Sequence, residues 1–209
     1  MPFSRSPRIE VLDFGRVDYA ETSARMLRMV AERAAGAAPD RILLCEFEPV
    51  LTVGRGASAD DFAGAGLPVH EVSRGGKATF HGPGQVVAYP ILGLEGDARD
   101  LHAYLHALED ALIRTVGDFG VVGERDPRNT GCWVGGRKIA SIGVAVRRWV
   151  TYHGVALNVA TELGYFGRFE PCGLEPDLMT SLAREGAAPL DFGSVKFALA
   201  ARLVEVLRA

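Results

Sequence analysis

Two stretches in the second half of the chain alternate small and bulky side chains. They are residues 141–146 (Ser-Ile-Gly-Val-Ala-Val) and 154–159 (Gly-Val-Ala-Leu-Asn-Val). A period of two predicts a β-strand for each stretch, with one bulky face and one small face. The bulky faces can pack on helices. The small faces either let a ligand approach the backbone or pack against a closely apposed helix.

Helical and extended patterns interleave along the rest of the chain. Apolar residues recur at helical spacing in 18–36, 98–116 and 194–209, and the first of these opens with a pattern that resembles a capping box, Asp18-Tyr19-Ala20-Glu21. Strand-like runs cover 9–14, 41–47, 50–53, 68–72, 78–80 and 85–92. Strands in consecutive hairpins mixed with three helices predict an α/β (α+β) fold, a mixed and mostly antiparallel sheet backed by helices.

Length and composition predict one self-sufficient domain over residues 1–209. With 209 residues, 48% of them apolar, the chain can bury its own core without disulfides or metals. The net charge of −3 provides no overall attraction to nucleic acid or an anionic membrane. No apolar run approaches the ~18 residues of a membrane span, and the N-terminus has no secretory pattern. We therefore expect a cytoplasmic protein without nucleic-acid or membrane partners.

The chain has three cysteines, Cys45, Cys132 and Cys172. An odd number without Cys-x-x-Cys spacing argues against a disulfide framework and against a metal site. Cys45 and Cys132 lie in apolar surroundings and are expected to be buried packing residues. Cys172 stands between Pro171 and Gly173, a context that suits an accessible loop. There it is either a nucleophile, which needs a cation or base beside it, or an inert packing residue.

Residues 74–85 form a glycine-rich segment, Arg-Gly-Gly-Lys-Ala-Thr-Phe-His-Gly-Pro-Gly-Gln. Its backbone can approach a ligand closely, and its amides and cations can meet an oxyanion or phosphate. The alternative is a purely structural turn between two strands. The segment lacks the leading glycine and the hydroxyl of a Walker A motif. The chain also has no dinucleotide fingerprint, no His-Glu-x-x-His and no Gly-x-Ser-x-Gly, so these families of sites are excluded.

Two further residues are candidates for chemistry, Lys138 and His153. Lys138 enters an apolar, small-residue strand, where partial burial lowers an ammonium pKa and makes the lysine a candidate acid or base. The alternative is a lysine at the end of a hairpin that reaches water. For His153, a structural histidine with satisfied hydrogen bonds is the simpler interpretation.

Five motifs in this order resemble one family, and they span residues 48–182. They are Pro-Val-Leu-Thr-Val-Gly-Arg at 49–55, Arg-Gly-Gly at 74–76 with Thr-Phe-His-Gly-Pro-Gly-Gln at 79–85, Gly-Arg-Lys-Ile-Ala-Ser-Ile-Gly at 136–143, Thr-Tyr-His-Gly-Val-Ala-Leu-Asn-Val at 151–159, and Pro-Cys-Gly at 171–173. The chain resembles the octanoyl-[acyl carrier protein]:protein N-octanoyltransferases, or lipoyl(octanoyl) transferases, within the biotin/lipoate protein ligase fold group.

The resemblance implies an acyltransferase of lipoate biosynthesis and protein lipoylation. It would move an octanoyl (or lipoyl) group from acyl carrier protein to a specific lysine of lipoyl domains, such as those of 2-oxoacid dehydrogenase E2 subunits and the glycine cleavage H protein. Cys172 would carry the acyl group as a thioester, and Lys138 would be its partner. No cofactor is implied, and a monomer is the default expectation. Substrate contacts would fall on Arg74, Gly75, Gly76, Lys77, Ala78, Thr79, Phe80, His81, Ser141, Ile142, Gly143, His153, Gly154, Val155 and Ala156.

The sequence departs from the family pattern at position 77, where Lys77 replaces the usual glutamine, and at Trp149-Val150, where smaller residues are common. Both protein substrates implied by the resemblance are generally acidic. A local basic rim could attract them, or the charges could be a solvated scatter. The candidate rim residues are Arg74, Lys77, Arg137, Arg147, Arg148 and Arg168.

Two alternative functions remain at this point. One is an ATP-dependent lipoate or biotin protein ligase of the same fold group, which would leave Lys138 and Cys172 unexplained. The other is a non-catalytic module that docks acyl carrier protein or lipoyl domains.

Overall fold

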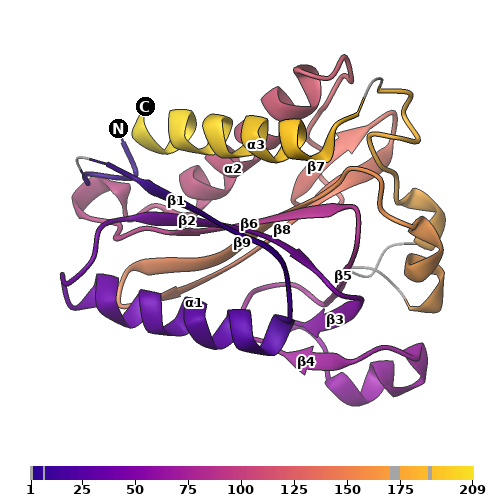
Figure 1. Cartoon of the computed structure of the whole chain (residues 1–209), viewed down its shortest axis with the longest axis horizontal. Coiled ribbons are helices and arrows are strands. Elements are labelled where there is room, and N and C mark those ends of the chain that lie inside the picture. The colour runs from indigo at the N-terminus through magenta and orange to yellow at the C-terminus, as the bar shows by residue number, and fades with distance from the viewer. Residues whose placement is uncertain (1, 7, 170–174, 188–189) are drawn as a thin grey trace.

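The computed structural model describes residues 2–6, 8–169, 175–187 and 190–209. A six-stranded sheet forms its centre, with the strand order β1-β2-β6-β9-β8-β7 (Figure 1). β1 pairs with β2 in parallel, and the other neighbours pair antiparallel. The strands are β1 (Glu10–Val17), β2 (Arg41–Phe47), β6 (Gln85–Ile91), β7 (Gly131–Val134), β8 (Arg137–Arg147) and β9 (Val150–Asn158).

A separate three-stranded sheet, in the order β4-β3-β5, lies at one end of the large sheet (Figure 1). Its strands are β4 (Val69–Glu71), β3 (Val50–Val53) and β5 (Ala78–His81). β3 is parallel to β4 and antiparallel to β5. The glycine-rich segment therefore leads from this small sheet directly into β6, a central strand of the large one.

The large sheet is covered on both faces. α1 (Tyr19–Ala34) lies against one face, and α2 (Leu101–Gly117) and α3 (Phe192–Arg208) lie together against the other (Figure 1). Each helix begins after an aspartate, Asp18, Asp100 or Asp191, whose side chain accepts hydrogen bonds from the first-turn backbone amides. The three predicted helices are confirmed, although α2 begins later than expected because residues 96–98 form a short 3₁₀ turn.

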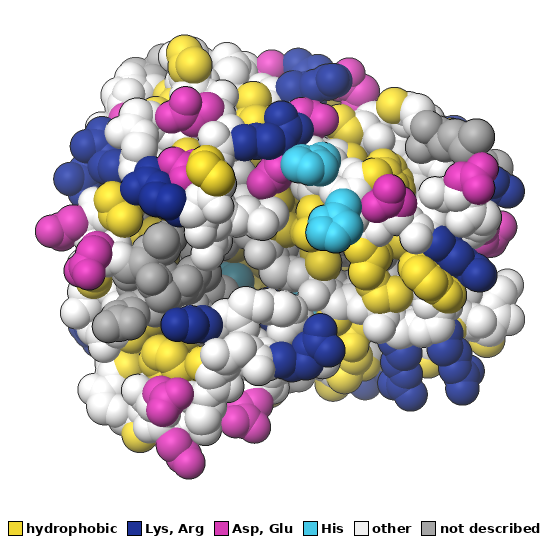
Figure 2. Space-filling model, turned by 180° about the vertical axis from the view of Figure 1, so that it is seen from behind, with side chains coloured by type: hydrophobic (Ala, Val, Ile, Leu, Met, Phe, Trp, Pro, Cys, Tyr) yellow, Lys and Arg dark blue, Asp and Glu magenta, His cyan; other side chains and the backbone are white. Residues whose placement is uncertain are grey.

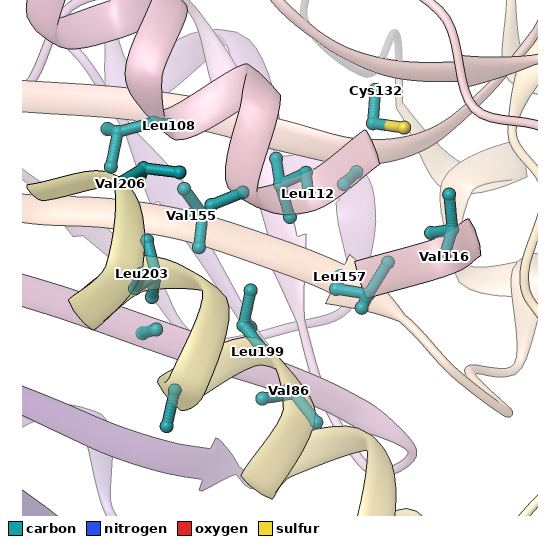
Figure 3. Packing of buried hydrophobic residues seen from close by; sticks show 14 of the residues in the cluster. Val86, Leu108, Leu112, Val116, Cys132, Val155, Leu157, Leu199, Leu203 and Val206 are labelled. Atoms are coloured by element: carbon teal, nitrogen blue, oxygen red, sulfur yellow. The ribbon is translucent and has the colours of Figure 1, made fainter. Parts of the chain in front are cut away.

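Alternate side chains of the central strands pack on opposite faces of the sheet. On β2, Ile42 and Leu44 join the cluster under α2 and α3, whereas Leu43 and Cys45 join the cluster under α1. Figure 3 shows the first cluster, where α2 and α3 direct leucines and valines onto the bulky side chains of β6 and β9. The mixed, mostly antiparallel sheet backed by helices is thus confirmed, as is the helix-packed bulky face of the strand at 154–159.

Two features were not predicted, β7 and the separation of the strands into two sheets. β7 has only four residues and follows a turn-rich stretch, so its periodicity is too short to detect. β8 begins at Arg137, earlier than the alternating pattern at 141–146 indicates, because its first part pairs with β7 across a register shift between Cys132 and Trp133. Among the described residues, no helix is long and apolar enough to span a membrane.

Candidate active site

A pocket opens where the small faces of β8 and β9 meet the glycine-rich segment and the start of α1. It comprises about 380 Å³ not filled by atoms, including its mouth. Its lining is Tyr19, Thr52, Arg74, Thr79, His81, Tyr89, Ser141, Ile142, Gly143, His153, Gly154, Val155 and Ala156. Ten of these thirteen residues are among the predicted substrate contacts. Segments far apart in the sequence therefore meet at one place.

Five predicted contact residues lie outside this lining: Gly75, Gly76, Lys77, Ala78 and Phe80. In β5, alternation directs Thr79 and His81 to the pocket, while Phe80 points away and stacks on the Tyr165 ring with centroids 4.6 Å apart. The backbone amide of Gly75 donates to the Val144 carbonyl of β8. Residues 75–77 therefore attach the loop to the rest of the site rather than line the pocket.

Three lining residues were not predicted, namely Tyr19, Thr52 and Tyr89. They come from the start of α1, from β3 and from β6, outside the motif positions that suggested ligand contacts. Burial raises the pKa of Tyr19 to about 12, so its hydroxyl stays protonated and can donate a hydrogen bond. Only the chain's folding shows that these side chains face the pocket.

Arg74 is buried and holds the loop in place. Its guanidinium donates to the backbone carbonyl and hydroxyl of Thr52, at 2.6 and 2.9 Å, and to the carbonyls of Gly75 and Lys77. A Cβ on Gly143 would lie only 2.7 Å from the Arg74 Cδ, so the absence of a side chain there makes room for the arginine. The small face of β8 thus admits Arg74 as well as a ligand.

His153 reaches the pocket through an unusual backbone conformation. Adjacent strand residues normally point to opposite faces, but the rings of Tyr152 and His153 lie with centroids 5.1 Å apart. The φ of +55° at His153 turns its side chain toward this side, where its ring meets the edge of Tyr89. Burial, aided by the charge of Arg74, lowers the His153 pKa to about 3, so the imidazole is neutral at physiological pH.

The small face of β9 is crowded by the sheet itself at one point. A Cβ on Gly154 would lie 2.3 Å from the Ala88 carbonyl oxygen of β6. Ala145 and Ala156 belong to the apolar cluster under α1. Packing under α1 is confirmed for part of the small faces, whereas room for a ligand stays a prediction for the part that lines the pocket.

Lys138 is buried near the end of β8, three residues along the strand from Ser141. Its ammonium donates to the Asn129 side-chain carbonyl oxygen and lies 5.8 Å from the centre of the Trp133 ring. A Cβ on Gly131 would lie 2.8 Å from Lys138 Cε, so the glycine leaves the lysine its space. Met179 pairs with Lys138 as a parallel β-bridge. The lysine is 1% exposed, so the alternative of a hairpin-end lysine in water is wrong.

The structure tests the predictions for two of the three cysteines. Cys172 lies outside the described residues, so its predicted loop position stays a prediction. Cys45 and Cys132 are buried, and burial raises the pKa of each thiol to about 12. Both are therefore protonated packing residues, as expected. Among the described residues, no group of three or more His, Cys, Asp or Glu side chains is placed to hold a metal ion.

The predicted basic rim does not form as a single patch. Arg74 is buried, Arg137 pairs with Glu185 at 2.9 Å, and Arg147 and Arg148 line a hollow against α1. Figure 2 shows Lys and Arg side chains in several separate groups with acidic side chains among them. Two of the candidate residues share one hollow, which is lined by Lys77 and Arg168 together with residues of the 56–65 segment.

Comparisons with known proteins identify the family of this chain. The model of the lipoyl protein ligase A/B catalytic domain matches residues 18–204. An octanoyltransferase of Geobacter metallireducens is 44% identical over 192 residues, which cover 92% of this chain and 90% of that protein. One of Syntrophobacter fumaroxidans is 46% identical over 181 residues, which cover 83% and 79% of the two chains.

A solved structure shares the fold at low identity. The bi-partite lipoate protein ligase of Thermoplasma acidophilum, from an archaeal lipoylation system with its E2 lipoyl domain, superposes with a TM-score of 0.73 and 13% identity. The match covers 95% of this chain and 83% of that one. The chain belongs to the lipoyl protein ligase A/B catalytic domain family. Its similarity to octanoyltransferases over most of their length makes it an acyltransferase, acting in octanoyl transfer for protein lipoylation.

Proposed function

We propose that the protein works through an octanoyl thioester on Cys172, with Lys138 as the partner of that thiol. In the first step, the Cys172 thiolate attacks the thioester of octanoyl-acyl carrier protein, and the carrier thiol leaves with the proton. In the second, the neutral amine of a lipoyl-domain lysine attacks the Cys172 thioester, the C–S bond breaks, and the amine's proton ends on the thiol. An amide replaces a thioester, so no ATP is needed.

The buried position of Lys138 is the observation that supports this proposal. A fixed cation favours a thiolate beside it, and a buried amine can exchange protons during both steps. Asn129, Trp133 and Gly131 hold the side chain in place. Met179, seven residues after Cys172 in the sequence, pairs with Lys138.

We assign the acyl chain to the pocket whose lining begins at Ser141, on the same strand as Lys138. Ser141 is about 10 Å along β8 from Lys138, at ~3.3 Å per strand residue. The lining there combines apolar atoms of Ile142, Val155 and Ala156 with the glycines at 143 and 154. We assign the predicted contacts in this lining to the donor and acceptor substrates. The acceptors would be lipoyl domains of E2 subunits and the H protein, and the whole chain would act as one cytoplasmic catalytic unit, as a monomer.

Intact-mass spectrometry tests the covalent step. The protein is mixed with octanoyl-acyl carrier protein without ATP, and an apo lipoyl domain is then added. We expect one octanoyl adduct, mapped to Cys172 and then discharged onto a lipoyl-domain lysine. Transfer that appears only with ATP and free octanoate would replace this mechanism by that of a ligase. Transfer by neither route would leave a docking module.

Variants sharpen the assignment. Cys172→Ser should form no thioester, while Cys132→Ser, a buried cysteine away from the pocket lining, should be acylated normally. Lys138→Met keeps the bulk of the side chain but removes its ammonium, and we expect turnover to fall about 10²- to 10⁴-fold. Arg137→Met is the matched control on the same strand. A Lys138→Met enzyme within about threefold of wild type would contradict the role of Lys138.

A further inference from the structure

A chain of buried polar side chains crosses the sheet behind the pocket. It runs from His81 at the end of β5 through Gln85 at the start of β6 to Asn158 at the end of β9. His81 Nδ1 lies 2.7 Å from Gln85 Oε1, and Gln85 Nε2 lies 3.0 Å from Asn158 Oδ1. All three residues are at most 5% exposed. Burying a polar group without a hydrogen-bond partner costs free energy, so these three paired side chains form a specific hydrogen-bond network of the fold.

Two backbone carbonyls fix the direction of every hydrogen bond in the chain. Asn158 Nδ2 donates to the Thr180 carbonyl at 3.0 Å, so its Oδ1 faces Gln85 and must accept. Gln85 Nε2 therefore donates there, and it also donates to the Phe80 carbonyl at 3.1 Å. Gln85 Oε1 is left facing His81 and can only accept. The proton of the neutral His81 ring must sit on Nδ1.

The other ring nitrogen of His81 is then an acceptor at the pocket wall. Burial lowers the His81 pKa to about 4, so Nε2 is unprotonated at neutral pH and accepts hydrogen bonds, with the Thr52 hydroxyl as its partner in this structure. Nε2 lies 3.5 Å from the Thr52 hydroxyl, and both residues line the pocket. A nitrogen of such low basicity is a poor proton carrier, but it remains a good hydrogen-bond acceptor.

The same series of hydrogen bonds also connects His81 with Lys138. The Thr180 amide donates to the Lys138 carbonyl at 3.0 Å, and the Leu182 amide donates to the Asn158 carbonyl at the same distance. Residues 180–182 are thereby tied to both β8 and β9. One hydrogen-bonded frame thus sets the position of the histidine and of the lysine.

We propose that Gln85 and Asn158 are positioning residues that hold His81 as its Nδ1–H tautomer, so that His81 Nε2 receives an N–H of the lysine amine attacking the acyl group. The amine is oriented by His81, and its proton ends on the Cys172 sulfur as the C–S bond breaks. This role rests on the proposed thioester mechanism, because it belongs to the second step. The tautomer itself does not depend on that mechanism.

The tautomer can be read directly. Nitrogen NMR shifts of the histidine rings, assigned with a His81→Asn variant, distinguish protonated from unprotonated ring nitrogens at pH 7. We expect protonated Nδ1 and unprotonated Nε2 for His81 in the full-length protein. Gln85→Met removes the acceptor and should give a mixture of tautomers. A protonated Nε2 in the wild type would overturn the proposal.

The two half-reactions test the role. Gln85→Met should slow lysine transfer from preformed octanoyl-enzyme about 10- to 100-fold, as loss of a supporting hydrogen bond does in other sites, and leave acylation within about threefold. Thr115→Val, which removes a buried hydroxyl on α2, is the control for a general loss of polar packing. Equal slowing of both steps, or unchanged transfer, would reject the positioning role. Absence of an octanoyl-enzyme in the wild type would instead reject the thioester mechanism.

Discussion

The two faces of the six-stranded sheet are built from the same strands but have different contents. The face under α2 and α3 is a continuous apolar layer, in which Leu112 and Leu199 pack with Val155 and Leu157. The other face is covered by α1 over part of its area, and the remainder holds Arg74, His81 and His153 around the pocket. Apolar side chains can pack against many kinds of neighbour, whereas each buried polar group needs a hydrogen-bond partner. The first face therefore mainly supplies stability, and the second supplies chemistry.

The largest expected effect is on the helix-packed face. Leu199→Ala removes a fully buried side chain of α3, and we expect about 2–5 kcal/mol less free energy of unfolding. The acyl-transfer rate per folded molecule should stay within about twofold. Urea unfolding and single-turnover transfer, measured side by side, check both parts. A large fall in the rate of the folded enzyme would break the division between the two faces.

A smaller effect should appear on the pocket face as the pH falls. The pKa values of His81 and His153 are lowered from 6.5 to about 4 and about 3, chiefly by burial. The unfolded chain therefore binds protons below pH 6.5 that the folded protein refuses, so stability decreases as the pH falls from 6.5 toward 4. Between pH 7 and pH 5 we expect a loss of roughly 2 kcal/mol for each of the two histidines.

Two variants test whether His153 contributes to this pH dependence of stability. His153→Asn removes one titrating ring, and asparagine suits the positive φ at that position. Its urea-unfolding free energy should vary less with pH than that of the wild type. His102→Asn, at an exposed position of α2, should leave the pH dependence unchanged. If the unfolding free energy of His153→Asn changes with pH as steeply as that of the wild type, His153 is not one of the groups that the folded state holds neutral.

Gly143→Ala tests whether the small face of β8 serves the pocket or only packing. The new methyl would lie 2.7 Å from Arg74 Cδ, so the arginine stem must shift. We expect about 1 kcal/mol of destabilisation and a roughly 10-fold fall in kcat/KM, since misplacing a pocket group lowers rate more than stability. Gly117→Ala at the end of α2, where a Cβ meets nothing within 4 Å, is the control. A stability loss with unchanged kcat/KM would assign Gly143 to packing alone.

The smallest effect concerns surface charge. Lys77→Gln with Arg168→Gln removes both cations from their shared hollow, and the KM for acyl carrier protein should rise about two- to fivefold, with a weaker salt dependence. Arg147→Gln with Arg148→Gln, over α1, should leave that KM unchanged. A KM that responds only to the second pair would move the docking surface to the β8–β9 turn.

Local patterns predicted much of the fold because they reflect neighbours in the sequence. Helical spacing located α1, α2 and α3, with a predicted aspartate cap for α1 alone, and alternation located β9 and most of β8. The short β7 was missed because its period is too short to detect, and the separation of β3, β4 and β5 into their own sheet was missed because a local pattern does not show which strands pair. Most of the pocket residues came from the family resemblance, and Tyr19, Thr52 and Tyr89 came only from the folded chain.

The sequence by itself determined that the chain has an apolar core, small-faced strands and a glycine-rich segment, and it left Lys138 open between burial and a position in water. Only the tertiary structure decided that Arg74 is enclosed rather than exposed, that Phe80 faces away from the pocket, and that His153 turns into it. It also decided the hydrogen-bond direction through Gln85 and Asn158, which depends on the carbonyls of Phe80 and Thr180. The physical reason is that burial, side-chain direction and hydrogen-bond partners depend on atoms from distant segments, and a local pattern contains no information about them.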